Sequence, residues 1–149
     1  MSVNYLRLIP TDPTYAPPLT KDQQAEQLLA VFVPKSTEIT SHRYENIQFV
    51  DAGSNWEAIH CPGCRAILED DTWKDLVDQA SVTHFVNLSL VMPCCGVISS
   101  LNDLSYGWPV GFARFVLQAR DPDGQLNGEQ LRLLERILGC RLRTIWTHY

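Results

Sequence analysis

The amino-acid sequence predicts an α+β fold in one domain that spans residues 1–149. Three observations lead to this class. The chain has the length of one ordinary domain, and 45% of its residues are hydrophobic, enough to bury a core. Each end of the chain reads as strand, Asp-Pro loop, helix and strand. The cysteine-rich middle, residues 54–105, reads as an insertion between these two ends.

The first half of the chain predicts two strands around a helix. Residues 3–10 (VNYLRLIP) read as a strand, followed by a proline-rich loop. A helix should begin near Thr20, because Thr20 and Gln23 have capping-box spacing. Its apolar stripe comprises Ala25, Leu28, Leu29 and Phe32. Pro34 ends the helix, and residues 45–53 (ENIQFVDAG) then predict a strand that ends in a turn.

The second half predicts two more helices. An acidic start at Glu69 favours a helix N-terminus, and apolar residues follow at helical spacing through Ala80. Residues 84–92 (HFVNLSLVM) predict a strand, as do 56–60, 97–101, 112–120 and 140–149. Between the last two, DPDG marks a turn and residues 127–138 predict a helix that ends at Gly139.

The two ends of the chain resemble each other at a displacement of about 106 positions. Ala25, Leu28, Val31 and Phe32 then fall on Leu131, Leu134, Ile137 and Leu138. Either a duplication or the general likeness of amphipathic helices produces such an echo. Two β-α-β units of this kind predict a ferredoxin-like layer, an antiparallel sheet with both helices on one face.

Two short cysteine motifs stand out in the middle of the chain. Residues 60–64 read HCPGC, and residues 92–96 read MPCCG. In a zinc knuckle of the form C-P-x-C-G, two thiolates three residues apart bind one tetrahedral ion. Cys61 and Cys64 match that spacing. In the second motif, Cys95 takes the place of the second cysteine, and Met92 stands where the first is expected.

Two such motifs, each at the end of a strand, resemble a zinc ribbon. The resemblance is limited to CPGC and MPCCG and identifies no specific family. It implies a structural zinc site formed by Cys61, Cys64, Cys95 and a fourth group. We expect Cys94 as the fourth ligand, with His60 and His84 as alternatives.

Other interpretations of the cysteines stay open. Met92 is a poor zinc ligand because its uncharged thioether suits copper(I) better. CPGC can also be a redox motif, although such motifs normally open a long helix, and the cysteines can be buried and inert. Cys140 follows a helix end and is expected in the core. The odd count of five cysteines does not favour a disulfide framework.

Composition argues against several classes of protein. A net charge of −5 is unfavourable for gripping a phosphate backbone, so we expect no nucleic-acid partner. No apolar run reaches the roughly 18 residues of a membrane helix, and we expect no membrane partner. The first residues do not resemble a signal peptide, so we expect a cytoplasmic protein. The sequence says nothing about the oligomeric state.

The sequence lacks the common catalytic motifs, and a large aromatic pair provides the best candidate for a contact surface. HExxH, GxSxG, Walker A and GxGxxG are all missing. Tyr106 and Trp108 lie in a loop with glycine and proline, and both residue types are common interface anchors. Trp108 can equally fold back and cover the core.

These observations lead to a functional expectation. We expect a zinc-stabilised, non-enzymatic module that binds another protein, of the adaptor, inhibitor or toxin-immunity type. The alternative is a metal-dependent or thiol-redox enzyme that uses the cysteine cluster. An open metal position or an exposed, acidic thiol would distinguish the enzyme from the module.

Overall fold

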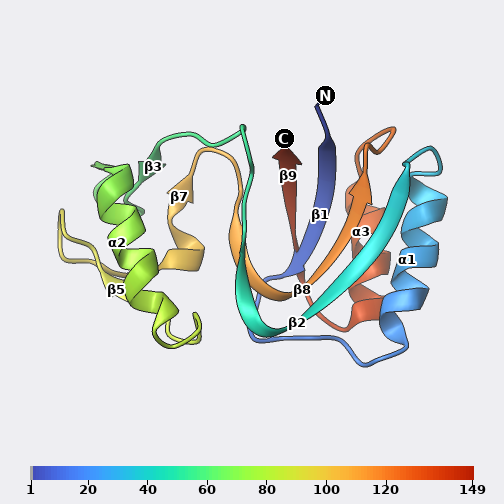
Figure 1. Ribbon diagram of the computed structural model, residues 1–149, viewed down its shortest axis with the longest axis horizontal. Coiled ribbons are helices and arrows are strands. Elements are labelled where there is room, and N and C mark those ends of the chain that lie inside the picture. The colour runs from blue at the N-terminus through green and yellow to red at the C-terminus, as the bar shows by residue number, and fades with distance from the viewer. Residues whose placement is uncertain (1) are drawn as a thin grey trace.

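The computed structural model describes residues 2–149 and contains three α-helices and antiparallel sheets (Figure 1). The α+β class predicted from the sequence is therefore confirmed. The elements follow one another as β1 (Asn4–Pro10), α1 (Lys21–Phe32), β2 (Glu38–Val50), β3 (Ile59–His60), β4 (Ile67–Leu68), α2 (Asp70–Ser81), β5 (Ser89–Val91), β6 (Ile98–Ser100), the 3₁₀ turn η1 (Leu101–Asp103), β7 (Ser105–Tyr106), β8 (Gly111–Arg120), α3 (Gly128–Leu138) and β9 (Leu142–His148).

The main sheet has four strands in the order β2-β8-β1-β9, and every neighbouring pair is antiparallel. Its elements come from the two ends of the chain, as β1-α1-β2 and β8-α3-β9. Helices α1 and α3 cover the same face of the sheet (Figure 1). This arrangement leaves β2 and β9 as the two edge strands.

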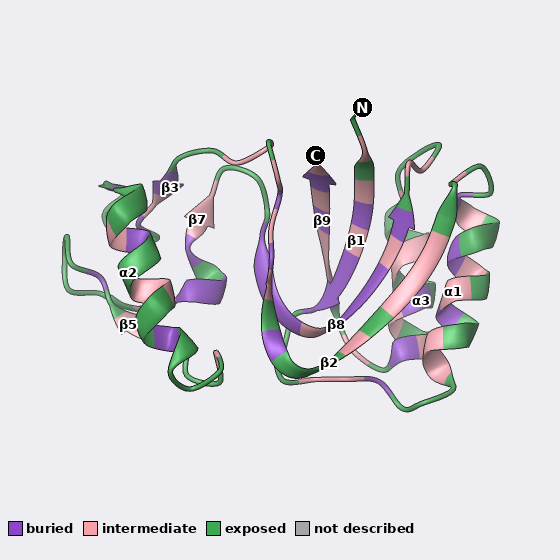
Figure 2. Cartoon of the chain, in the orientation of Figure 1, coloured by how far each residue is buried: buried purple, intermediate pink, exposed green. Residues whose placement is uncertain are grey.

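The larger hydrophobic core lies between these helices and the sheet. Alternate residues of the central strands point into it, as period-two strands require. Its fully buried members include Leu6, Leu8, Phe115, Leu117 and Leu134. Figure 2 shows the result: the central strands β1 and β8 are largely buried, while the outer faces of α1 and α2 are exposed.

Residues 51–110 form a separate part of the molecule, which we call the cysteine lobe (Figure 1). They lie between β2 and β8, which pair with each other. The pairing shifts register between Arg43 and Gln48, where β2 bends toward the lobe. A second hydrophobic core, of aliphatic and aromatic side chains, lies in the lobe and includes Trp73, Leu88 and Met92, with Phe112 of β8 packed into it.

Asn102 joins the lobe to the sheet. It is only 6% exposed, and its side-chain oxygen accepts hydrogen bonds from the backbone N–H of Phe112 at 3.0 Å and from Arg143 at 3.2 Å. Its side-chain nitrogen donates to the carbonyl of Thr11 at 3.4 Å. One buried amide therefore ties η1 to β8, to β9 and to the loop after β1.

The structure corrects several of the predicted strands. Of the strand expected over residues 56–60, only Ile59–His60 form β3, and the short strands β4 and β7 lie in segments where no strand was predicted. Strand β2 begins at Glu38 rather than at residue 45. Residues 84–88 are not part of a strand, because the backbone turns back at the end of α2, with positive φ at His84 and Phe85. This turn places the Phe85 ring 5.2 Å from that of Phe112 in the lobe core.

The helices match the predicted ranges, but one predicted cap is wrong. The Thr20 side chain makes no capping hydrogen bond, and Thr20 itself has a left-handed backbone. The capping box lies instead at α3, between Asn127 and Gln130, and this helix ends at Gly139 as predicted.

The two helices have a similar pattern of buried residues, but not in the register expected from the sequence. In α1 the buried residues are Ala25 and Leu29, and in α3 they are Leu134 and Leu138. Val31, which the sequence echo matched to a partly buried residue of α3, is 69% exposed. Within residues 2–149, no helix is both long and apolar enough to cross a membrane.

Candidate metal centre

The two cysteine motifs fold into turns with the same backbone hydrogen bonds. In the first turn, Cys61 N–H donates to the carbonyl of Ala66 at 2.9 Å, and Arg65 N–H donates to that of Cys61 at 3.1 Å. In the second, Met92 N–H donates to the carbonyl of Val97 at 2.9 Å, and Gly96 N–H donates to that of Met92 at 2.9 Å. The second turn therefore repeats the first, with Met92 in the place of Cys61.

The fifth residue of each turn has a left-handed backbone. This residue is Arg65 in the first turn, with φ of 66°, and Gly96 in the second, with φ of 76°. Glycine adopts this conformation freely, whereas a side chain makes it unfavourable. The first turn therefore has arginine at the position where a zinc knuckle of the form C-P-x-C-G has glycine.

The correspondence explains the unusual spacing of the second motif. Met92 is 1% exposed and packs in the lobe core, so it leaves the sulfur cluster one ligand short on that side. Cys94 stands where the first turn has Gly63. Its sulfur supplies the missing group from the middle of the turn rather than from its start.

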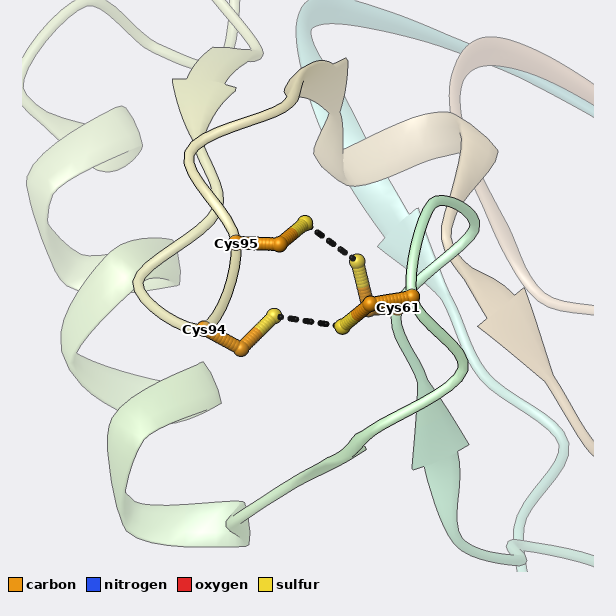
Figure 3. Close-up of side chains that lie close together, drawn as sticks. Cys61, Cys94 and Cys95 are labelled. Carbon is orange, nitrogen blue, oxygen red and sulfur yellow. Dashed lines mark hydrogen bonds between the residues drawn. The ribbon is translucent and has the colours of Figure 1, made fainter.

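The four sulfur atoms of Cys61, Cys64, Cys94 and Cys95 lie within 4.8 Å of one another. The sulfurs of Cys61 and Cys95 are 3.7 Å apart (Figure 3). Those of Cys64 and Cys94 are 3.4 Å apart. A tetrahedral ion with metal–sulfur bonds of about 2.3 Å has sulfurs about 3.8 Å apart. A disulfide would bring two sulfurs to about 2.05 Å. The cluster can therefore hold a metal ion and contains no disulfide.

The pKa of the Cys61 thiol is lowered to about 6. The largest cause is the backbone N–H of Cys64, and the N–H of Gly63 adds to it by donating to the sulfur at 3.3 Å. Burial of Cys61 opposes this shift but does not cancel it. The first turn therefore favours a thiolate at Cys61 near neutral pH.

The two thiols of the second turn behave in the opposite way. The pKa of Cys94 is raised to about 12, first by its hydrogen bond with Cys64 and then by desolvation of its sulfur among the other cysteines. The pKa of Cys95 is also raised: the N–H of Val97 lowers it, but burial and the neighbouring Cys61 outweigh that hydrogen bond. Because four negative charges this close together repel one another, the four thiols do not all ionise unless a cation lies among them. A cation among them reverses this preference and favours four thiolates.

The alternative ligands considered from the sequence lie outside the cluster. The group of close sulfurs contains Cys94, and neither His60 nor His84 belongs to it. His60 lies on β3, where it pairs with Ile67, and His84 is exposed in the turn after α2. Cys140, expected in the core, packs partly buried against the sheet core, away from the cluster.

The aromatic pair proposed as a contact surface divides into two different environments. The Tyr106 hydroxyl donates to the carbonyl of Leu101 at 2.6 Å and accepts from the Trp73 indole at 3.1 Å. Burial raises the pKa of Tyr106 to about 12. Trp108 is 39% exposed, and its indole N–H donates to Glu57 at 3.1 Å. Tyr106 therefore belongs to the lobe core, and Trp108 remains as the exposed ring.

Two residues that support the site were missed from the sequence. Val97 covers the first turn, because a side chain added at Gly63 would lie 2.9 Å from Val97 Cγ1. Asn102 anchors the lobe to the sheet. Periodicity gives no signal for either residue, since both act through contacts between segments far apart in the sequence.

The arrangement can bind one metal ion through four protein sulfurs, and such a site has no position left for water or substrate. Comparison of the chain with protein-family models, with curated proteins and with solved structures finds no match.

Proposed function

We propose that this chain is a non-enzymatic protein-binding module whose cysteine lobe is held by a structural zinc ion. The ligands in this proposal are Cys61, Cys64, Cys94 and Cys95. The observation that carries it is the approach of all four sulfurs to within 4.8 Å of one another, from two turns with the same backbone hydrogen bonds.

Zinc is the ion that best suits this set of ligands. Thiolates are soft ligands, and four of them in a tetrahedral arrangement favour zinc or an iron–sulfur centre over magnesium or calcium. The sulfur separations of 3.4 and 3.7 Å match a single ion with bonds of about 2.3 Å. Such an ion would also stabilise the lobe, whose strands are only two or three residues long.

The same features support two finer descriptions of the fold. The strand order β2-β8-β1-β9, with both helices on one face, supports a ferredoxin-like main sheet. The paired turns, each followed by a short strand, support a zinc-ribbon-like insertion between β2 and β8.

The thiol-redox alternative receives less support from the site. A redox nucleophile must be both acidic and accessible. Here the thiol of lowered pKa, Cys61, is fully buried. The exposed Cys94 has a raised pKa. The metal-enzyme alternative needs an open coordination position, and four sulfurs would fill a tetrahedral site.

Trp108 supports the protein-binding part of the proposal. Its ring is large and partly exposed, and the hydrogen bond to Glu57 holds it in one orientation. A rigid aromatic ring buries a large area on binding and gives up little conformational freedom. An adaptor, an inhibitor and a toxin-immunity protein all require a preformed surface of this kind.

Native mass spectrometry of the untagged protein, combined with thiol counting, tests the zinc site. We expect one zinc ion per chain and four thiols protected from alkylation until a chelator is added. Cys94→Ser should lower the zinc content, whereas Cys140→Ser, the matched control outside the cluster, should not. Full zinc occupancy in Cys94→Ser would contradict the ligand set.

Affinity capture tests the binding function. Wild type, Trp108→Ala and Tyr44→Ala serve as baits in a lysate of the source organism, and each captured protein is then purified and its affinity measured. Tyr44 is the control because it is an exposed aromatic residue on β2. We expect a purified partner to bind wild type and Tyr44→Ala equally and Trp108→Ala at least about tenfold more weakly. Equal binding to all three would contradict the proposed surface.

A further inference from the structure

Strand β9 presents an edge that is only partly used. It pairs with β1 on one side and has no strand of the main sheet on the other. In an antiparallel pair, alternate residues direct their backbone groups toward the partner strand, and the residues between them direct theirs outward. Tyr149 exchanges hydrogen bonds with Val3 on the β1 side. Odd-numbered residues of β9 therefore face β1, and even-numbered ones face the free edge.

The two ends of this edge are already occupied by the chain itself. At one end, Leu142 N–H donates to the Glu135 carboxylate at 2.8 Å. At the other, Ser54 N–H donates to the carbonyl of His148 at 2.7 Å, and Gly53 forms a parallel bridge with His148. The chain's own turn at residues 52–54 thus shows that the outward backbone groups of β9 are accessible to hydrogen bonds from another backbone segment.

Between these ends lie the outward backbone groups of Thr144 and the outward N–H of Trp146, which face the free side of β9. The Trp146 carbonyl is bonded to the side chain of Asn55 at 3.3 Å. Among the hydrogen bonds of residues 2–149, none engages Thr144 N–H or Trp146 N–H on the outer side of β9. The open stretch spans three residues, about 10 Å at roughly 3.3 Å per residue.

Two hollows lie along this stretch. One, of about 480 Å³, is lined by Trp108, Trp146 and Pro122 together with polar side chains. The other, of about 410 Å³, lies between Thr144 and the segment from Asn102 to Val110 of the cysteine lobe. We call the free edge together with these two hollows the β9 groove; the rings of Trp108 and Trp146 both line the first hollow.

The groove carries little net charge. Arg143, which lines it, is 3.5 Å from Asp103 in a salt bridge. The other titratable groups in the lining are Tyr106, whose hydroxyl is hydrogen-bonded within the lobe, and His148, whose ring nitrogen contacts Asn4. An occupant therefore needs backbone donors and acceptors and an apolar side chain rather than charge.

We propose that this groove binds an extended, uncharged peptide segment of a partner protein, which adds to β9 beside Thr144 and places one large apolar side chain between Trp108 and Trp146. Strand addition supplies affinity through main-chain hydrogen bonds and specificity through alternate side chains. This inference rests on the proposed protein-binding function and names its partner class.

A second copy of this chain suits the groove less well. The lobe segment from Asn102 to Val110 lines the hollow beside Thr144, and a second copy would have to bring its own lobe as well as its β9 to this edge. A single extended strand needs only the width of the groove. The experiment below therefore uses free peptides as the probe.

The test begins with a phage-displayed library of linear random peptides, selected against the zinc-loaded full chain. Enriched peptides are synthesised and their affinity is measured by fluorescence anisotropy. The decisive step is a backbone N-methyl scan of the best peptide, because each methyl group removes one N–H donor. We expect losses of about tenfold at alternate positions and no loss between them, as strand addition requires.

Two protein variants provide an independent readout. Thr144→Pro removes the outward N–H at an edge position that tolerates proline, and we expect affinity to fall about tenfold. Thr144→Val changes the side chain but keeps the N–H, and it should bind as wild type does. Circular dichroism and the melting temperature establish that each variant is folded.

Three results would overturn the inference: no enriched peptide, an N-methyl scan without alternation, or equal affinity for Thr144→Pro and wild type. These failures are separate from failure of the proposed function. A partner that loses affinity for Trp108→Ala but not for Thr144→Pro would support the module and reject the strand-addition groove.

Discussion

At the scale of single residues, the most consequential side chain outside the sulfur cluster is Asn102. It is buried, and one oxygen atom accepts from both the Phe112 backbone and the Arg143 guanidinium. Removing that acceptor leaves the buried N–H of Phe112 without a partner, which is more unfavourable than losing an exposed hydrogen bond. Arg143 loses one of its contacts but keeps its hydrogen bond to the Val110 carbonyl and its salt bridge with Asp103.

Replacement of Asn102 with alanine should therefore destabilise the protein by about 2–3 kcal/mol. Equilibrium unfolding in urea measures this change. Asn46→Ala is the matched control, because Asn46 is exposed on β2 and should change stability by less than about 0.5 kcal/mol. Similar losses in the two variants would show that Asn102 does not join the lobe to the sheet energetically.

The two turns of the candidate metal site can be compared by opposite substitutions at equivalent positions, to glycine in one turn and from glycine in the other. Arg65 and Gly96 occupy the same left-handed position. A side chain there is unfavourable by about 1–2 kcal/mol, and glycine has a smaller entropic disadvantage in the unfolded chain. Arg65→Gly should thus stabilise the zinc-loaded protein by about 0.5–1 kcal/mol.

Gly96→Ala should destabilise it by about 1 kcal/mol, through backbone strain alone, since no atom lies within 4 Å of the added carbon. Thermal unfolding of both variants at a fixed zinc concentration measures the two effects. Shifts of the same sign would mean that the two turns are not equivalent.

At the scale of elements, the helix caps show what a sequence pattern can and cannot specify. Thr20 and Asn127 each begin a pattern with capping-box spacing, yet only Asn127 forms the cap. Ahead of α1, Lys21 N–H donates to the carbonyl of Pro18, and this tight turn gives Thr20 a left-handed backbone. Its hydroxyl then cannot reach the first turn of the helix.

Asn127→Ala should destabilise the protein by about 1 kcal/mol, because it removes the acceptor for Gln130 N–H at the start of α3. Thr20→Ala should change stability by no more than a few tenths of a kcal/mol, since no cap is lost. Chemical denaturation of the two alanine variants provides the comparison. A larger loss for Thr20→Ala would contradict the assignment of the caps.

The sequence predicted those parts of the fold and the site that depend on local patterns, and it failed where contacts between distant segments decide the structure. Strong periodicity located all three helices, and turn chemistry located Gly139 and both cysteine motifs. Of the strand expected over residues 84–92, residues 89–91 form β5, whereas the first part is a turn in which Phe85 packs against Phe112, a residue from a distant strand. Local patterns carry no information about such contacts. The role of Asn102 was missed for the same reason.

At the scale of the whole molecule, a metal ion that binds the four-sulfur cluster must release protons from the thiols, so its affinity depends on pH. The pKa values of Cys94 and Cys95 are raised, so both thiols carry protons at neutral pH before zinc binds. Binding of the proposed zinc ion must displace at least these two protons. The zinc association constant should therefore rise by at least about two log units per pH unit near neutral pH.

Below about pH 6 the proton of Cys61, whose pKa is lowered to about 6, must also be displaced, and the slope should steepen. Competition with a chelator of known pH dependence measures the association constant across this range. An association constant independent of pH would mean that the thiols are not the ligands. A slope that becomes shallower as the pH falls would contradict the low pKa of Cys61.

If the cysteine lobe holds the proposed zinc ion, the two parts of the molecule should respond differently when that ion is removed. The main sheet has long strands and a core of its own beneath α1 and α3. The cysteine lobe has strands of two or three residues, and its two turns are joined at the sulfur cluster. Short sheets of this kind are marginal without a further constraint.

Hydrogen exchange followed by mass spectrometry, before and after chelation, measures this difference. We expect fast exchange after chelation at β3, β5 and β6 and retained protection at β1 and β8, because the buried sheet keeps its hydrogen bonds when the lobe opens. Chelator added to Cys94→Ser should produce little further change, which controls for effects of the chelator itself. A uniform rise in exchange over both parts would instead mean that the Asn102 junction makes lobe and sheet one cooperative unit, with the metal stabilising the whole chain.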